Sequence, residues 1–289
     1  MPSRETARLG GLRTTCRLLG VAATLLLGPA AAHAAELDIP VPYVPSTAVA
    51  VDEMLRLASI TPQDVVVDLG SGDGRIVIAA AKKFGARGFG VDIDADLVRE
   101  ANDNARKQGV AERVQFFQRD IFATDISQAS VVTLYLLTGM LERLKPKLLN
   151  ELKPGARVVA HEFAIPGWRP DLHVNISKDI YLWVVPAQVA GKWELAAQLP
   201  GGPRRYEFEL AQQNQVIRGG ARVPGGYLPL FDARIDGDRI SFVVVEGDVP
   251  HHFDGRVAGG SMQGQVKSGV GREAVESNWR AVKASGGAS

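Results

Sequence analysis

The chain has 289 residues, which is enough for one large domain or two modest ones with a substantial core. Its 33 Lys and Arg residues nearly balance 32 Asp and Glu residues, so the net charge of +1 gives no support for a nucleic-acid-binding surface. A single cysteine excludes both a disulfide framework and a thiolate metal site within the chain.

Residues 1–34 have the three parts of a secretory signal peptide. An apolar core over 18–32 follows a basic region and precedes the small-x-small site Ala32-His33-Ala34. The basic region consists of Arg4, Arg8, Arg13 and Arg17. We expect cleavage near Ala34, which would place the mature protein in the periplasm or outside the cell. The apolar run is short for a membrane span of about 20 residues, so an uncleaved anchor in the inner membrane is the alternative.

Residues 35–45 carry three prolines and predict an extended lead-in to the first domain. Ser46 or Thr47 is expected to cap a helix that ends at Thr61-Pro62. Strand and helix patterns then alternate as far as residue 163. Strands are predicted over 64–69, 88–91, 113–118, 130–136 and 156–163, and helices over 75–84, 96–108 and 139–152. This alternation predicts a doubly wound, Rossmann-like α/β domain over 35–186, with helices on both faces of a parallel sheet.

The last third of the chain, residues 187–289, has a different pattern. Short segments rich in β-branched residues, such as "RISFVVVEG", are separated by Gly-Gly, Asp-Gly and Gly-Asp turns. We therefore expect a smaller antiparallel all-β domain, either a sandwich or a small barrel.

Acidic residues fall at three of the predicted strand ends, and a glycine turn follows the first of them. Asp68 precedes Gly70-Ser71-Gly72-Asp73-Gly74, while Asp92 and Asp120 follow the second and third strands. A dinucleotide turn needs a third glycine where Arg75 stands, and carboxylates beside a pyrophosphate would cost energy. The turn therefore favours a ligand that carries positive charge and no phosphate. S-adenosylmethionine fits, since it has a sulfonium, an ammonium and two ribose hydroxyls.

The stretches "VVDLGSGDGRI", "GVDID" and "FQRDIF" resemble the class I S-adenosylmethionine-dependent methyltransferases. The resemblance implies that the three glycines admit the cofactor, that Asp68 holds its methionine end and that Asp92 accepts its ribose hydroxyls. Asp120 and the backbone of Ile121 would read the adenine edge. The complete set expected to bind the cofactor is Asp68, Gly70, Ser71, Gly72, Gly74, Asp92, Ile93, Asp120 and Ile121.

A narrower resemblance covers about residues 40–185. "VPYVPSTAVAVDEML" and "TLYLLTGMLERLKPKLLNELKPGARVVAHEF" are similar to the mitochondrial protein-lysine methyltransferases that modify the adenine nucleotide translocase and the ATP synthase c subunit, and to their bacterial relatives. This resemblance implies a protein-lysine acceptor. Two alternatives remain open: a small-molecule or lipid acceptor held by the β-domain, and an exported non-catalytic binding protein that reuses the fold.

Three side chains are expected around the methyl acceptor, namely Tyr43, Tyr135 and Glu162. The tyrosines have an alternative role in packing over the cofactor, and Glu162 has one as a solvated strand end. The residues 133–136 replace the Asn-Pro-Pro-Tyr of adenine and glutamine methyltransferases, which disfavours methylation of a nucleic-acid base. His161, His251 and His252 lack the spacing of a zinc site, so no metal is expected.

Overall fold

The structure is a computed structural model that describes residues 44–224 and 226–284. The predicted signal peptide and Tyr43 lie outside the described residues. Within the described ranges, no helix is both long and apolar enough to cross a membrane.

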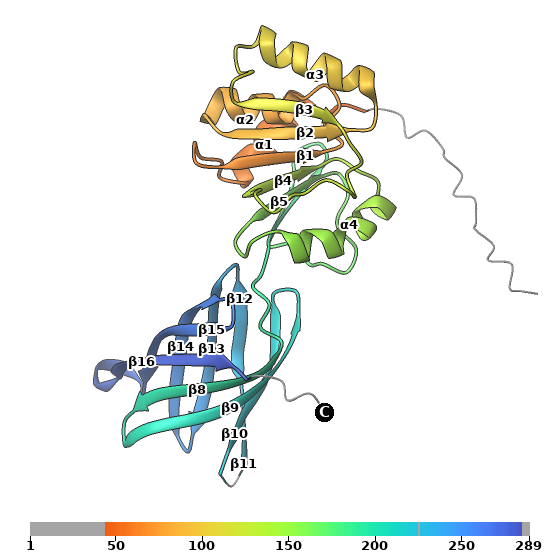
Figure 1. Ribbon diagram of the computed structural model, residues 1–289. Coiled ribbons are helices and arrows are strands. Elements are labelled where there is room, and N and C mark those ends of the chain that lie inside the picture. Colours follow the sequence, from red (N-terminus) through yellow and green to blue (C-terminus); the bar gives the residue numbers. More distant parts are fainter. Residues whose placement is uncertain (1–43, 225, 285–289) are drawn as a thin grey trace, which may run out of the picture. The chain divides into compact units, whose positions relative to one another are not determined.

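The first sheet of the described residues has seven strands in the order β3-β2-β1-β4-β5-β7-β6 (Figure 1). The parallel strands are β1 (Val65–Leu69), β2 (Arg87–Asp92), β3 (Val114–Gln118), β4 (Val131–Leu134) and β5 (Arg157–His161). The hairpin of β6 (Leu172–Asn175) and β7 (Asp179–Val184) continues the sheet antiparallel to β5. The order reverses between β1 and β4, which places a ligand crevice at the carboxyl ends of these strands.

Helices cover both faces of this sheet, as predicted. They are α1 (Ala48–Leu57), α2 (Arg75–Phe84), α3 (Ala95–Lys107) and α4 (Thr138–Glu151). Alternate residues of a strand face opposite sides, so Val66 packs with α1 and α2 while Val67 packs with α4. Helix α3 packs beside α2 through Ala101 and Ala105. The doubly wound α/β fold is therefore confirmed.

Local signals account for most element limits. Thr47 Oγ1 accepts a hydrogen bond from the backbone N–H of Ala50 at 3.2 Å, and Asp94 Oδ1 accepts from that of Asp96 at 2.8 Å. Both side chains cap helices at the expected positions. The β6–β7 hairpin was not predicted. It follows β5, and its first strand, β6, is only four residues long and largely exposed, whereas β7 is partly buried, with Ile180 and Trp183 in the core.

The second sheet is an antiparallel barrel that begins at Gly191, so the predicted boundary at residue 186 lies between the two sheets. Its strands are β8 (Gly191–Leu199), β9 (Gly202–Gln213), β10 (Val216–Val223), β11 (Gly226–Pro229), β12 (Phe231–Asp236), β13 (Arg239–Glu246), β14 (Val249–Ala258), β15 (Ser261–Ser268) and β16 (Val275–Lys283). The order runs from β11 and β10 through β12–β16 to β8 and β9, and β9 pairs back with β10 (Figure 1). That last pairing closes the ring.

Aromatic side chains fill the barrel interior. The Phe242 ring stacks on that of Phe253 at 4.8 Å between centroids, and Trp279 meets both rings edge-on at 5.8 Å. The cavity among Trp193, Phe208 and their described neighbours has a volume of about 10 Å³, enough for at most one water molecule. This part of the barrel interior therefore has no room for a small-molecule acceptor.

Candidate active site

The glycine turn joins β1 to α2 and is tied to the end of β2. Gly70, Gly72 and Gly74 have φ angles of 85°, 51° and 82°, in the left-handed region that favours glycine. The backbone N–H groups of Gly70 and Ser71 both donate to Val91 O at 2.9 Å. The backbone of the turn is therefore held in one conformation at the carboxyl edge of the sheet.

Close packing beneath the turn explains why small residues recur there. A Cβ on Gly74 would lie 2.6 Å from Phe116 Cζ, and one on Gly90 would lie 2.5 Å from Ser71 Cβ. Ser71 is 5% exposed, and among the described residues its hydroxyl has no hydrogen-bond partner. The Ser71 side chain thus packs against β2 beneath the turn.

Asp68 is a buried carboxyl group at the carboxyl end of β1. Its residue is 1% exposed, and its Oδ1 accepts a hydrogen bond from Thr133 Oγ1 at 2.7 Å. Burial raises the pKa of the Asp68 carboxyl to about 7, and the nearby carboxylates of Asp92 and Asp73 raise it further, against the effect of Thr133. A cationic ligand group beside Asp68 would favour its ionised form.

Asp92 and Asp120 continue this acidic row after β2 and β3. Asp92 accepts hydrogen bonds from the backbone N–H of Gly72 at 2.9 Å and of Asp94 at 3.0 Å, and Asp120 Oδ1 accepts from that of Phe122 at 2.8 Å. Each carboxylate is thereby oriented and keeps free acceptor capacity.

The two isoleucines expected beside these carboxylates differ in exposure. Ile93 is 73% exposed and Ile121 is 7% exposed.

The structure brings together the carboxylates of Asp68, Asp92 and Asp120 at the ends of neighbouring strands, as predicted from the sequence. Their contacts with a cofactor remain predictions.

Arg75, in the position of the missing third glycine, organises the approach to the site. Its guanidinium binds both carboxylate oxygens of Asp73, at 2.9 and 2.6 Å, and donates to Ser46 O at 2.7 Å. Arg75 therefore neutralises Asp73 and fixes the segment before α1 against the start of α2. This role was not predicted, because Arg75 and Ser46 are 29 residues apart in the sequence.

Two of the three predicted acceptor-site residues meet at the ends of β4 and β5. Tyr135 Oη donates to Glu162 Oε2 at 2.7 Å, and Lys178 Nζ binds Glu162 Oε1. These two hydrogen bonds hold the pKa of Glu162 below its usual range, while burial and Glu162 raise the pKa of Tyr135 to about 12. Glu162 also has a φ of 69°, which is rare for a residue other than glycine and is common at functional sites.

His161 lies beneath this pair and contacts the segment before α1. Its Nδ1 is 2.9 Å from Ser46 Oγ, and its ring centroid is 4.3 Å from that of Tyr135. Burial lowers the pKa of His161, so the ring is neutral at neutral pH. Lys178 is the residue that the sequence did not indicate, since it reaches Glu162 from the unpredicted β6–β7 hairpin.

Comparisons with known proteins agree with this geometry. Residues 68–172 match the ANTKMT methyltransferase domain. A protein-lysine N-methyltransferase of Saccharolobus islandicus is 47% identical over 151 residues, which cover 50% of this chain and 94% of that protein. The adenine nucleotide translocase lysine N-methyltransferase of Mus musculus is 36% identical, over 46% of this chain and 58% of that protein.

A solved structure described as an RNA methyltransferase from Salinibacter ruber in complex with S-adenosyl-L-homocysteine is 49% identical. It superposes with a TM-score of 0.50, over 50% of this chain and 96% of that one. The fold and the acidic glycine turn define the first domain as a class I methyltransferase domain. The chain belongs to the family of the Saccharolobus islandicus protein-lysine N-methyltransferase, and the predicted family resemblance is confirmed.

Proposed function

We propose that this chain is an S-adenosylmethionine-dependent protein-lysine N-methyltransferase. The observation that carries the proposal is its 47% identity to a protein-lysine N-methyltransferase, of which it covers 94%. The acidic row at the carboxyl edge of the sheet fits the cofactor, because Asp68 is a buried carboxyl that a cation would stabilise in its ionised form. We assign the ammonium of the cofactor to Asp68, its ribose to Asp92 and its adenine to Asp120 and Ile121.

The acceptor amine is expected to bind at Glu162 and Tyr135. When bound, S-adenosylmethionine supplies a methyl group on a positively charged sulfur. Tyr135 keeps its proton at neutral pH, since its pKa is about 12, and Glu162 is ionised and weakly basic. We therefore expect these side chains to orient the lysine nitrogen and stabilise the positive charge it acquires, while the amine loses its proton to water beforehand.

A transfer assay tests the proposal. Purified chain is incubated with S-adenosylmethionine carrying a labelled methyl group and with extracted protein, and methylated lysine is sought by mass spectrometry. Asp92→Ala is the control, because loss of its ribose hydrogen bonds should weaken cofactor binding by about 2 kcal/mol, or ~30-fold. Label in lipid or small molecules would overturn the protein acceptor, and no turnover with any acceptor would support the non-catalytic alternative.

RNA is the second candidate acceptor, because the Salinibacter ruber relative is described as an RNA methyltransferase. At residues 133–136 the chain lacks the Asn-Pro-Pro-Tyr stretch that binds a planar amino group, which favours a lysine acceptor instead. Including total RNA in the same assay distinguishes an RNA acceptor from a protein acceptor. Label that is removed by ribonuclease would establish RNA as the acceptor, and label that is removed only by protease would exclude RNA.

We also propose that residues 1–34 direct export and are removed near Ala34. The basic, apolar and small-x-small regions of this segment support the proposal. Fractionation of cells followed by N-terminal sequencing tests it. A chain starting near Ala35 in the periplasm or medium is the expected result. An intact chain in the membrane fraction would support the anchored form, and one in the cytoplasm would overturn export.

A further inference from the structure

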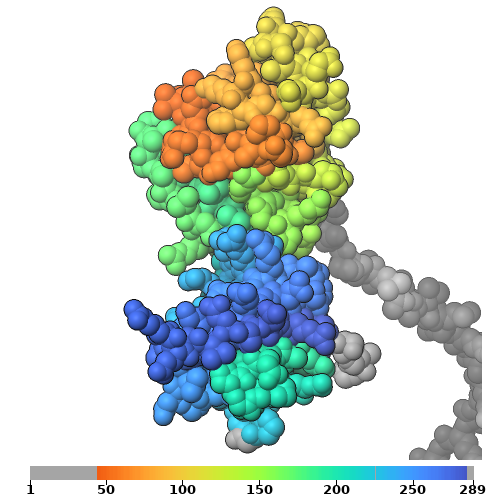
Figure 2. Space-filling view, turned by 90° about the vertical axis from the view of Figure 1, so that its left-hand side faces the viewer, coloured from red at the N-terminus to blue at the C-terminus, as the bar shows by residue number. Residues whose placement is uncertain are grey.

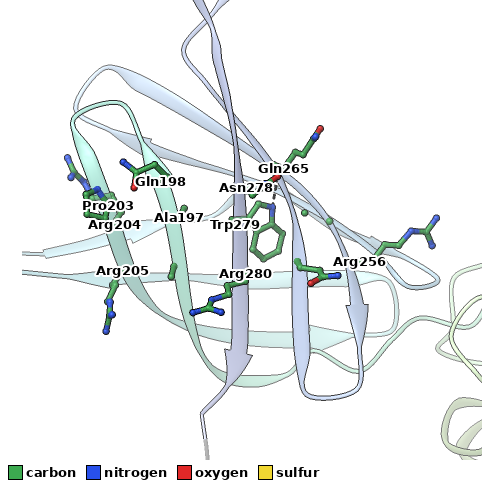
Figure 3. Close-up of a pocket in the computed structure, with 14 residues that line it drawn as sticks. Ala197, Gln198, Pro203, Arg204, Arg205, Arg256, Gln265, Asn278, Trp279 and Arg280 are labelled. Carbon is green, nitrogen blue, oxygen red and sulfur yellow. Dashed lines mark hydrogen bonds between the residues drawn. The ribbon is translucent and has the colours of Figure 1, made fainter.

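The outer surface of the barrel carries a depression with a volume of about 830 Å³ (Figure 3). Its lining includes the arginines Arg204, Arg205, Arg256 and Arg280, and it contains no Asp or Glu. Four carboxamide side chains complete the polar lining, namely Gln198, Gln263, Gln265 and Asn278. A surface with guanidinium groups and no carboxylates is suited to an anionic ligand.

The strand register places three of these arginines in one row across the barrel. Arg256 lies opposite Gln263, Gln263 opposite Arg280, Arg280 opposite Ala196, and Ala196 opposite Arg205. We call these five residues the arginine row. Figure 2 shows this side of the barrel, where β16 lies beside β8, which pairs in turn with β9. Since neighbouring strands are about 4.8 Å apart, the backbones of Arg280 and Arg205 are ~10 Å apart, with a short side chain between them.

Two guanidinium groups of the depression are available to a ligand. Arg256 is paired with Asp238 at 2.6 Å, and Arg204 with Glu246 at 3.4 Å. Across the two described ranges, neither Arg205 nor Arg280 has an ion pair. A ligand that presents two carboxylates would therefore find two uncommitted partners on either side of Ala196.

The borders of the depression favour a thin chain over a nucleic acid. Glu194 and Glu207 lie next to the arginine row on one side, and Asp254 lies opposite Gln265 on the other. A duplex would bring phosphates against these carboxylates. A single strand usually gains affinity by stacking on exposed aromatic rings, and the aromatic residue of the lining, Trp279, is 3% exposed.

We propose that the depression docks an extended acidic segment of a protein. Two carboxylates of that segment, two or four positions apart and therefore on one face of the extended chain, would bind Arg280 and Arg205, since such a chain advances about 3.3 Å per residue. The carboxamides both donate and accept hydrogen bonds, so they match the peptide groups of such a segment. That the segment belongs to the protein whose lysine is methylated rests on the proposed function.

Fluorescence anisotropy with the full chain tests this docking site. The probe is a labelled Gly-Ser peptide of about twelve residues with two glutamates four positions apart, so that both lie on one face of the extended chain, and the comparison peptide has glutamines in their place. We expect the glutamate peptide to bind at least about ten-fold more tightly, and Arg205→Gln with Arg280→Gln to abolish the difference. Arg218→Gln with Arg272→Gln is the control of equal charge, since both arginines are exposed and outside the depression.

Ala196→Glu is the second test, and it replaces the double variant if that variant fails to fold. It sets a carboxylate between the two arginines, so we expect it to abolish binding of the glutamate peptide. Equal binding of both peptides, equal loss in the control variant, or tighter binding of a single-stranded RNA of similar length would overturn the proposal. Peptide binding requires no methyl transfer, so it would survive if the lysine activity were disproved, and its failure would leave that activity standing.

Discussion

Asp68 combines burial with a position where the proposed cofactor brings positive charge. Its pKa rises from 3.8 in a model peptide to about 7 in the fold, because burial disfavours the ionised form. The folded protein therefore holds a proton that the unfolded chain releases between these values. It follows that the contribution of Asp68 to the free energy of unfolding falls as pH rises from about 4 to about 7, and then stays constant.

The same titration should control cofactor binding. We expect the affinity for S-adenosylmethionine to increase as pH rises from about 5.5 to 7, because only ionised Asp68 pairs with the ligand ammonium, which is mostly charged in this range. Calorimetric titration at several pH values measures the effect. Thr133→Val removes a hydrogen bond that lowers the pKa of Asp68, so it should move the profile to higher pH. Asp68→Asn should bind weakly and flatten the profile, and an unchanged slope in that variant would rule out this carboxyl as the titrating group.

Glu162 and Tyr135 should affect turnover more than cofactor binding. Tyr135→Phe removes the hydroxyl that is 2.7 Å from Glu162, and one hydrogen bond to a charged group is worth ~1.5 kcal/mol. We therefore expect kcat to fall about ten-fold, with Glu162→Gln falling at least as far. Steady-state kinetics and cofactor titration separate the two effects. A loss of cofactor affinity equal to the loss of kcat would instead place Tyr135 over the cofactor, which was its alternative role.

At the level of single elements, Gly74 in the glycine turn and Gly109 after α3 allow the cost of packing to be separated from the cost of backbone conformation. Gly74→Ala places a Cβ 2.6 Å from Phe116 Cζ at a φ of 82°, whereas Gly109→Ala has a φ of 71° and open space around the added atom. The left-handed conformation costs each variant ~1 kcal/mol, and overpacking adds about 1–3 kcal/mol at Gly74 alone. Urea denaturation measures the difference. Equal destabilisation of the two variants would show that Phe116 moves aside.

The sequence was most informative where structure depends on neighbouring residues. Helix α2 spans the predicted residues 75–84, and Asp94 caps α3 as expected, because apolar spacing and capping are local signals. Contacts between distant residues carried no such signal. Arg75 reaches Ser46 across 29 residues, and Lys178 reaches Glu162 across 16 residues from the turn of a hairpin that was not predicted. The Ser71 side chain packs in the space left by Gly90, a contact that the sequence did not indicate, and its role at the cofactor stays a prediction.

On the scale of the whole molecule, the two sheets have separate hydrophobic cores. One core comprises buried residues between 187 and 281, and the others lie between 50 and 185. We predict that Phe253→Ala, at a stacked position in the barrel, destabilises the barrel by about 3–5 kcal/mol and leaves cofactor binding intact. Leu141→Ala, between α4 and the first sheet, should lower the stability of the methyltransferase domain instead by about 2–5 kcal/mol. Calorimetric scans with and without cofactor test this, and a shift of the cofactor-sensitive transition by Phe253→Ala would contradict it.

Closure of the barrel also determines how other molecules can meet it. Because β9 pairs back with β10, the hydrogen-bonding groups of these strands are occupied within the ring, and a partner strand cannot extend the sheet there. An open sheet gains much of its affinity for an extended peptide from backbone hydrogen bonds, which every sequence can make. Recognition by a closed ring depends on outward side chains, so a few substitutions on its surface could change its partner without disturbing the fold.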